Sequence, residues 1–312
     1  MLSRVACNLY WIGRYLQRAE NTARLINVNA NLMMDLPRRM TLGWGPLIEI
    51  VGADTTFRSH YEEATEENVV RFLIADPRNP GSIQSSLYQA REILRTVRDT
   101  MPRDTWERLN DMYFYVQERG ELGVSRVPRQ ALLAEIVDGT LLIFSVLASS
   151  MSRDVGFQFL RIGTNLEQAD MTSRILDVRS TRLGREPSGP DLTPFENIVW
   201  MSVLRSLTAY QMYRRSMKTR VNGSGVLRYL LQNREFPRSV MFCLSRIAST
   251  LPTLPESRKI ERAIERTRAL ARDANIDALL KSDVGVPRLM DEIQIGLGEL
   301  HEALDAAYFT TA

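Results

Sequence analysis

The spacing of apolar residues near the start of the chain limits its fold more than any other feature of the sequence. Apolar side chains recur there at intervals of three and four residues, at Leu2, Val5, Leu9, Ile12, Leu16, Ala19, Ala23, Ile26, Ala30 and Met33. Only an α-helix places such a series on one face. The pattern therefore predicts a long first helix that ends before Pro37.

Helical periodicity continues along the rest of the chain. Further helices are predicted over residues 82–101, over residues 256–273 and from Thr193 to about Arg220. No stretch alternates strictly between apolar and polar residues with hairpin turns at its ends, so no sheet is expected. We therefore predict an all-α protein with roughly ten to twelve helices.

Three other segments carry weaker signals. Residues 37–64 are the least regular, and residues 184–190 are the clearest linker because they contain two glycines and two prolines. The longest apolar run, residues 139–151, is too short to span a bilayer and is bracketed by Asp138 and Arg153. That run predicts a buried helix segment, and no membrane association is expected.

The sequence contains an internal repeat. Residues 12–28 match residues 162–178 at seven of seventeen positions, where about one identity is expected by chance. Two later matches keep the same order, residues 70–87 with 227–244 and residues 132–139 with 289–296. We predict one helical domain over residues 1–312, built from two repeats, 1–150 and 151–312, that intertwine about a pseudo-twofold axis.

Polar residues also repeat in the first matched segment. Glu20 and Arg24 of the first copy correspond to Asp170 and Arg174 of the second. An acid and an arginine four residues apart can form a local ion pair on one helix. Alternatively, the two polar stripes face each other as a salt-bridge network or as the floor of a polar cleft. The candidate polar cluster comprises Arg18, Glu20, Arg24, Glu167, Asp170 and Arg174.

A second repeated element predicts a helix start after a proline in each copy, at Ser82 and at Ser239. Free N–H groups at a helix start attract anions, and nearby guanidinium groups strengthen that attraction. Otherwise the two serines are plain N-caps and the arginines are surface charge. The candidate anion-binding residues are Arg71, Arg78, Ser82, Arg228, Arg234, Arg238 and Ser239.

Composition narrows the function classes. The 312-residue chain has a formal net charge of only +3, which argues against nucleic acid as a partner. Of its 40 basic residues, 37 are arginine, which reflects either a GC-rich genome or recognition of carboxylate or phosphate groups. Two histidines outside any Glu-x-x-His pattern and two cysteines without CxxC spacing predict no metal site and no cofactor. So few cysteines fit a reducing cytoplasm.

Three segments of the chain resemble a known family. Residues 9–24, their echo at residues 166–174 and residues 228–240 resemble the alpha-E family, a bacterial all-helical family named for a Glu-Arg signature. The resemblance covers essentially the whole chain. It implies partnership with circularly permuted ATP-grasp ligases and transglutaminase-like peptidases, and a role in making, attaching or processing a peptide or an amide-linked modification.

The Glu-Arg signature is split between the two copies of this chain. The first copy has Gln17 and Arg18 where Glu-Arg is usual, and the second has Glu167 and Gln168. With the signature split in this way, Arg18 and Glu167 can still form a single site, or they can form a purely structural pair. We therefore favour a non-catalytic accessory protein that binds the ligase, and an acidic or phosphorylated ligand through arginines. The alternative is a stand-alone amidotransferase or hydrolase with its site at Arg18 and Glu167.

Overall fold

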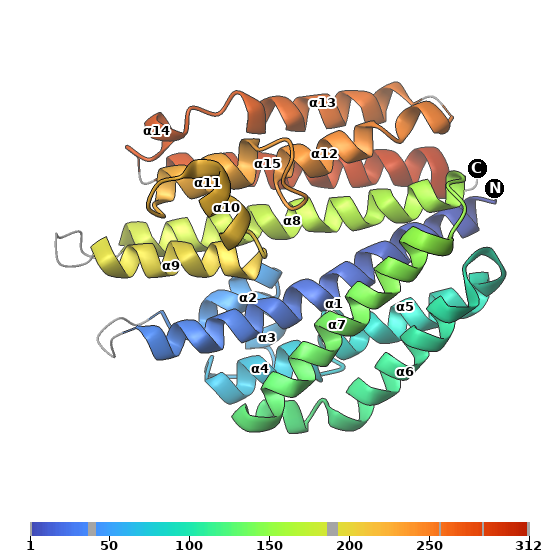
Figure 1. The fold of residues 1–312 in the computed structure, drawn as a ribbon, viewed down its shortest axis with the longest axis horizontal. Helices are drawn as coiled ribbons and strands as arrows, with labels where there is room; N and C mark the ends of the chain where they lie inside the picture. Colours follow the sequence, from blue (N-terminus) through green and yellow to red (C-terminus); the bar gives the residue numbers. More distant parts are fainter. Residues whose placement is uncertain (1, 37–41, 186–192, 256, 283, 311–312) are drawn as a thin grey trace. The chain divides into compact units, whose positions relative to one another are not determined.

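A computed structural model describes residues 2–36, 42–185, 193–255, 257–282 and 284–310 (Figure 1). All regular structure in these residues is helical, so the predicted all-α class is confirmed. The pseudo-twofold relation between the repeats stays a prediction.

The chain divides into two compact units. Unit 1 holds the residues up to Asn27, Gly43–Glu167 and the end of the chain from Tyr308, and unit 2 holds Val28–Leu42 and Gln168–Ala307. The two longest helices, α1 (Ser3–Asp35) and α8 (Val155–Arg185), contribute residues to both units. The units therefore differ from the predicted repeats, and the single-domain organisation stays a prediction.

Unit 1 is completed by six further helices and two short 3₁₀ turns. They are α2 (Gly45–Val51), α3 (Asp54–Arg58), α4 (Glu66–Ile74), α5 (Ile83–Val97), η1 (Arg98–Thr100), α6 (Arg103–Arg119), η2 (Leu122–Val124) and α7 (Arg126–Ser150). Helix α6 packs between α5 and α7, and η2 packs against α4 and α7. These contacts bury the apolar face that the periodicity of residues 83–97 predicts.

Unit 2 holds the remaining helices. They are α9 (Thr193–Ser206), α10 (Tyr210–Met217), α11 (Gly223–Gln232), α12 (Val240–Ala248), η3 (Leu251–Thr253), α13 (Arg258–Arg272), α14 (Ile276–Leu279) and α15 (Gly285–Leu304), followed by the π-helical turn η4 (Asp305–Phe309), whose last two residues belong to unit 1. Helix α13 packs against α15 and α12 (Figure 1). With fifteen α-helices among the described residues, the chain exceeds the expected ten to twelve.

The predicted helix from Thr193 to about Arg220 is wrong beyond Ser206. Thr208 takes a left-handed backbone conformation with φ of 53°, and the Ala209 amide donates to the Leu204 carbonyl at 2.7 Å. This is the arrangement in which helices commonly end at a glycine. Because a threonine occupies the left-handed position, the sequence contained no stop signal there.

Two other expectations need correction or lie outside the described residues. Of residues 139–151, all but Met151 belong to α7, but they are not a buried segment, since Leu141 and Leu142 are 45% and 41% exposed. By length and composition, α7 alone among the described helices could cross a membrane, yet it packs against α6 and η2. The linker predicted over 184–190 falls mostly outside the described residues, which resume at Thr193.

Two glycines at matching repeat positions allow α1 and α8 to approach each other within unit 1. A Cβ on Gly13 would meet the Leu160 carbonyl oxygen and would lie 2.9 Å from Thr164 Oγ1. A Cβ on Gly163 would meet the Tyr10 carbonyl oxygen and would lie 2.9 Å from the carbonyl carbon. Because these neighbours are mainly backbone atoms, only glycine permits this crossing. The crossing places α8 beside the polar side chains of α1.

Candidate functional site

Glu167 on α8 lies between two arginines of α1 in unit 1. Its Oε1 accepts a hydrogen bond from Arg18 Nε at 2.6 Å, and its Oε2 accepts from Arg14 Nε at 2.7 Å and Arg18 Nη2 at 3.1 Å. The Glu167 side chain is 4% exposed and the Arg18 side chain 25%. The structure thus brings together the two halves of the split signature.

Burial and charge act in opposite directions on Glu167. Burial alone would raise the pKa of its carboxyl group, but the charges of Arg18 and Arg14 and their hydrogen bonds outweigh burial and lower that pKa to about 2. The carboxylate therefore stays ionised at neutral pH, with both oxygens occupied. Such a group can hold two helices together, but it is poorly suited to accept a proton as a general base.

Arg14 belongs to this cluster, although it is not one of the predicted candidate residues. Its Nη1 donates to the Tyr10 hydroxyl at 3.2 Å, and its guanidinium carbon lies 5.0 Å from the ring centre of Trp11. Burial raises the pKa of Tyr10 to about 12. Arg14 corresponds to Thr164 in the second copy, so a search for repeated residues misses it. Its position one turn before Arg18 is the signal that could have found it.

Glu20 forms a second buried group on α1. Its side chain is 1% exposed and accepts hydrogen bonds from Arg24 Nε and from Gln17 Nε2, both at 2.7 Å. Gln17 Nε2 also lies 3.1 Å from Asn21 Oδ1. The acid and arginine predicted as a local pair therefore form one, but in a buried setting where each partner depends on the others.

The corresponding residues of α8 lie in unit 2 and are more open to solvent. Asp170 accepts hydrogen bonds from Arg174 Nε at 2.9 and 3.0 Å, and the two side chains are 22% and 32% exposed. With its amide oxygen facing Arg238, Gln168 accepts hydrogen bonds from Nε at 2.9 Å and Nη1 at 3.0 Å. Thr172 Oγ1 donates to the Arg238 carbonyl oxygen at 2.9 Å. Helix α8 is thereby bonded to the start of α12.

A comparison of matched positions shows an exchange of arginine between the two units. In unit 1 the guanidinium comes from Arg18 on α1, and a Cβ on Gly81 at the start of α5 would lie 4.0 Å from Arg18 Cδ. In unit 2 the position matching Arg18 is Gln168, and the position matching Gly81 is Arg238. In unit 1 the arginine lies on the long helix α1 and faces the start of α5. In unit 2 it lies at the start of α12 and faces the long helix α8.

The two serines of the predicted anion sites are helix N-caps. Ser82 Oγ accepts a hydrogen bond from the Ser85 amide at 3.1 Å, at the start of α5. Ser239 Oγ accepts one from the Phe242 amide at 3.1 Å, at the start of α12. Each serine therefore satisfies one amide of its own helix, which is the ordinary capping role.

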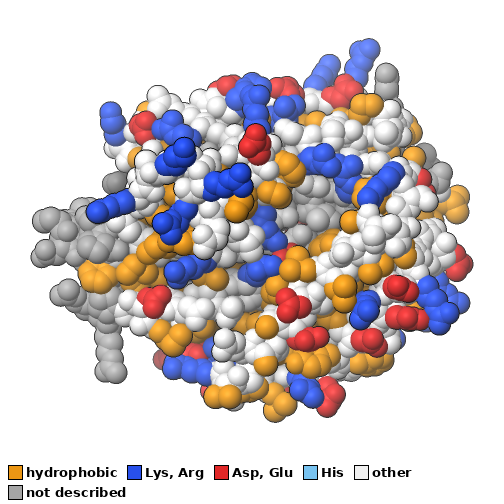
Figure 2. All heavy atoms as spheres, viewed as in Figure 1, with side chains coloured by type: hydrophobic (Ala, Val, Ile, Leu, Met, Phe, Trp, Pro, Cys, Tyr) orange, Lys and Arg blue, Asp and Glu red, His pale blue; other side chains and the backbone are white. Residues whose placement is uncertain are grey.

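The arginines of the predicted anion sites are distributed over both units. Arg71 and Arg78 lie in unit 1 with Ser82, and Arg228, Arg234 and Arg238 lie in unit 2 with Ser239. Three of them bond carboxylates, namely Arg71 with Glu67 and Glu121, Arg78 with Asp76, and Arg228 with Asp277. Arg234 is exposed. Basic side chains on the face shown in Figure 2 are likewise interspersed with acidic and apolar ones.

The buried cysteine Cys243 is poorly suited to act as a nucleophile. Burial raises the pKa of the Cys243 thiol to about 12, so it is not a thiolate at neutral pH. Within the residues that the structure describes, no group of three or more His, Cys, Asp and Glu side chains is placed to hold a metal ion. The polar clusters on α1 and α8 are therefore considered as structural groups rather than as a metal site.

Comparison with known proteins identifies the family. Residues 1–309 match the family model Alpha-E, described as a predicted alpha-helical domain with a conserved ER motif. Uncharacterized proteins of Mycobacterium bovis and of two strains of Mycobacterium tuberculosis are 27% identical over 331 aligned positions. The alignment covers 99% of this chain but 36% of each relative, so this chain spans about a third of their length. No solved structure matches it. Because the family model covers nearly every residue, including the split Glu-Arg signature, the chain belongs to the Alpha-E family.

Proposed function

We propose that this chain is a non-catalytic, cytoplasmic partner of a circularly permuted ATP-grasp ligase in a system that makes or tags peptides. One observation carries the proposal. Nearly all of this chain aligns with only 36% of its mycobacterial relatives, so in those proteins a similar domain is part of a much longer chain. Domains that share one chain commonly work together, because the linkage raises their effective concentration toward each other.

The chemistry of the polar cluster supports an accessory role. Both oxygens of Glu167 are bonded to arginines and its pKa is low, so Glu167 is not a free base beside Arg18. Glu20 is likewise occupied by Arg24 and Gln17. Groups satisfied in this way favour the positioning of helices over proton transfer.

The same proposal assigns the acidic or phosphorylated ligand to partly exposed arginines. Arg78 and Arg228 are 49% and 48% exposed and each has one carboxylate partner that a phosphate could replace. Arg234 lies on the surface close in sequence to Arg228. An acidic ligand held by these groups would bind less tightly as salt concentration rises, because exposed charges are screened.

Co-purification with a circularly permuted ATP-grasp ligase from the same organism tests the proposal. The full chain and the ligase are mixed without nucleotide, with ADP and with a non-hydrolysable ATP analogue, and the complex is measured by size-exclusion chromatography. We expect association in at least one nucleotide state. Absence of association in every state would contradict the partnership, and the transglutaminase-like peptidase is tested in the same way.

The stand-alone enzyme is the competing function, and one assay separates the two. Amide formation and hydrolysis are measured with purified protein alone and with Glu167→Gln. Turnover that depends on Glu167 in a variant that is still folded by circular dichroism would replace the accessory role with catalysis. We expect no turnover by the protein alone.

A further inference from the structure

Helix α7 exposes apolar side chains on the side opposite its buried residues. Its inner side chains are buried, and the helix contacts α6 and η2. On the other side Leu141 and Leu142 are 45% and 41% exposed, and Val127 is 90% exposed. Only 33% of the most apolar 18-residue stretch of α7 is buried. A surface helix ordinarily presents charged and polar residues to solvent, so this side of α7 has the character of an uncovered contact surface.

The exposed residues of α7 follow one stripe along the helix. Seven of them recur at alternating intervals of four and three residues and therefore share one face, namely Val127, Ala131, Ala134, Asp138, Leu141, Ser145 and Ala148. We call this stripe, together with Glu135 and Leu142, the outer face of α7. It is about 30 Å long. Small side chains toward its ends allow the backbone of another helix to approach, and the two leucines project between the side chains of such a helix.

Two carboxylates lie on the outer face without a counter-ion in the described chain. Glu135 and Asp138 are exposed, and no described side chain forms an ion pair with either of them. The exposed basic residues that flank the helix, Arg126 and Arg153, lie beyond the ends of the stripe. In Figure 2, apolar side chains are interspersed with acidic ones over the region where Figure 1 draws α6 and α7. The outer face is therefore apolar, with negative charge at its middle.

The two carboxylates select among the occupants that could cover this face. Asp138 is the middle residue of the stripe, so two copies of α7 packed antiparallel would bring their Asp138 side chains together. Parallel packing would oppose each acid to itself, and like charges repel in both cases. A lipid bilayer would enclose the carboxylates in hydrocarbon, where ionised groups are costly. A helix with lysine or arginine beside its apolar residues meets neither obstacle, because it pairs the acids and covers the leucines.

We propose that the outer face of α7 binds an amphipathic helix of a partner protein, one whose apolar side chains are bordered by lysine or arginine. The apolar side chains of that helix cover Leu141 and Leu142, and its basic side chains pair with Glu135 and Asp138. Recognition of this kind buries an apolar stripe and uses charge to select the partner. This binding surface is independent of the ligase partnership, because it includes none of the residues on which that proposal rests.

Fluorescence anisotropy tests the surface with two labelled synthetic peptides of about 20 residues, a length that covers the stripe. Both peptides carry the same leucine and alanine face, bordered by lysines in one and by glutamates in the other. We expect saturable binding of the lysine peptide and about tenfold weaker binding of the glutamate peptide. Because the chain has a formal net charge of +3, non-specific attraction would favour the glutamate peptide instead. Equal binding of both peptides, or no saturable binding of the lysine peptide, would overturn the proposal.

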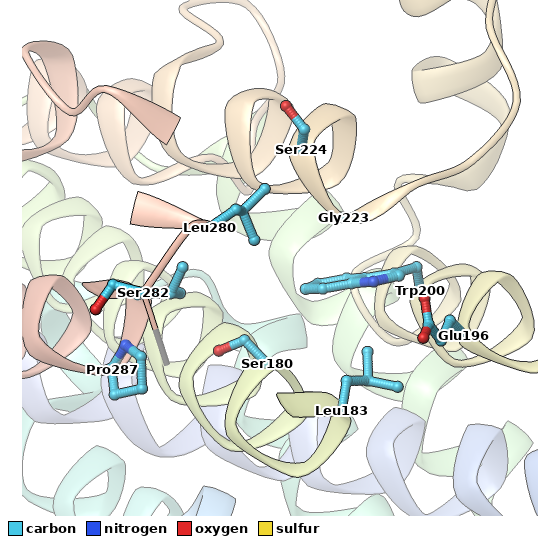
Figure 3. Close-up of a pocket in the computed structure, with 10 residues that line it drawn as sticks. Ser180, Leu183, Glu196, Trp200, Gly223, Ser224, Leu280, Ser282 and Pro287 are labelled. Carbon is cyan, nitrogen blue, oxygen red and sulfur yellow. The ribbon is translucent and has the colours of Figure 1, made fainter. Parts of the chain in front are cut away.

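Variants locate the binding on α7. Leu142→Asn should weaken the lysine peptide about tenfold, because it removes apolar contact area from the outer face. The matched control is Leu280→Asn, since Leu280 is 42% exposed and lines the pocket of unit 2 shown in Figure 3. If Leu142→Asn, folded by circular dichroism, binds the lysine peptide as the wild type does, α7 is not the binding surface.

Charge reversal is a second test, which leaves the apolar residues in place. Asp138→Lys should weaken the lysine peptide and strengthen the glutamate peptide, each by about threefold or more. Glu235→Lys, at an exposed acid of unit 2, should change neither. An Asp138→Lys variant that binds both peptides as the wild type does would contradict selection by charge, and with it the proposal.

Two further measurements test the other occupants. Light scattering shows whether the protein alone forms a dimer, and flotation measures its binding to phosphatidylcholine vesicles with and without phosphatidylglycerol. We expect neither a dimer nor vesicle binding that depends on Leu142. A dimer that Leu142→Asn dissociates, or vesicle binding that it abolishes, would replace the partner helix with a second copy of the chain or with a membrane.

Discussion

At the scale of single residues, Glu167 is a buried carboxylate that accepts three hydrogen bonds from two arginines. It is 4% exposed and is the shared counter-ion of Arg14 and Arg18. Glu167→Gln leaves two guanidinium groups facing each other without a charge between them, so we expect the free energy of unfolding to fall by about 3 kcal/mol. Urea unfolding measures this change.

A control lies three residues further along α8. Asp170→Asn breaks an ion pair that is 22% and 32% exposed, and should lower the free energy of unfolding by only about 0.5 kcal/mol. Equal losses in the two variants would contradict the special role of the buried pair.

Glu167 also predicts a pH dependence. Its pKa falls from an ordinary 4.5 in the unfolded chain to about 2 in the folded protein. Because the pKa is lower in the folded protein, the ionised carboxylate contributes its full stabilisation at pH values above the unfolded-state pKa. This contribution to the free energy of unfolding is lost as the pH falls toward 2, by at most about 1.4 kcal/mol per pH unit. The stability difference between the wild type and Glu167→Gln should therefore shrink between pH 4.5 and pH 2. The pKa of Asp76 is also about 2, but Asp76 is present in both proteins. Its contribution to the pH dependence of stability therefore cancels when the two proteins are compared.

The exchange of arginine between matched positions predicts coupling between Arg18 and Gly81. Gly81 has no backbone need for glycine, because among the described glycines only Gly43 and Gly52 have positive φ. Arg18→Gln alone removes one partner of Glu167, and Gly81→Arg alone crowds Arg18 with a like charge. Combined, they reproduce the residues found in unit 2, so we expect a favourable coupling free energy of about 1–2 kcal/mol in a double-mutant cycle. Purely additive effects of the two substitutions on the free energy of unfolding would contradict this coupling.

At the scale of elements, the crossing of α1 and α8 within unit 1 rests on Gly13 and Gly163. Gly163→Ala drives a Cβ into the Tyr10 backbone, which cannot move as a side-chain tip would. We expect a loss of about 3 kcal/mol in the free energy of unfolding. Gly298→Ala is the control, since a Cβ there meets nothing within 4 Å, and alanine should stabilise α15 by up to about 1 kcal/mol. Thermal unfolding measures the stability of both variants. A Gly163→Ala variant as stable as the wild type would contradict the close crossing of α1 and α8.

The elements also show where sequence patterns are informative. Long apolar series predicted α1, α5 and α13 to within a few residues, because burial of one helix face needs that spacing. The end of α9 was missed because Thr208 adopts a conformation that threonine rarely takes. The exposure of Leu141 and Leu142 was missed because an apolar run in the sequence does not indicate which face of the helix packs against the rest of the protein.

At the scale of the whole molecule, the two compact units do not follow the repeat boundary. Unit 1 needs α8 up to Glu167, which the fragment 1–150 lacks. We therefore expect the fragment 1–150 to have less helix than its share of the intact chain and no cooperative unfolding, as measured by circular dichroism during heating. Cooperative unfolding of that fragment alone would show that the first repeat is an independent folding unit.

The all-α class, the long first helix and the family could all be predicted from the sequence, because each follows from periodicity or from matches between residues at fixed spacing. The sequence also marked Arg18 and Glu167 as the two halves of one signature. That these two residues meet, and that Arg14 joins them, could be seen only in the folded protein. Such contacts join residues that lie far apart along the chain, and no local pattern specifies which helices approach closely enough to make them.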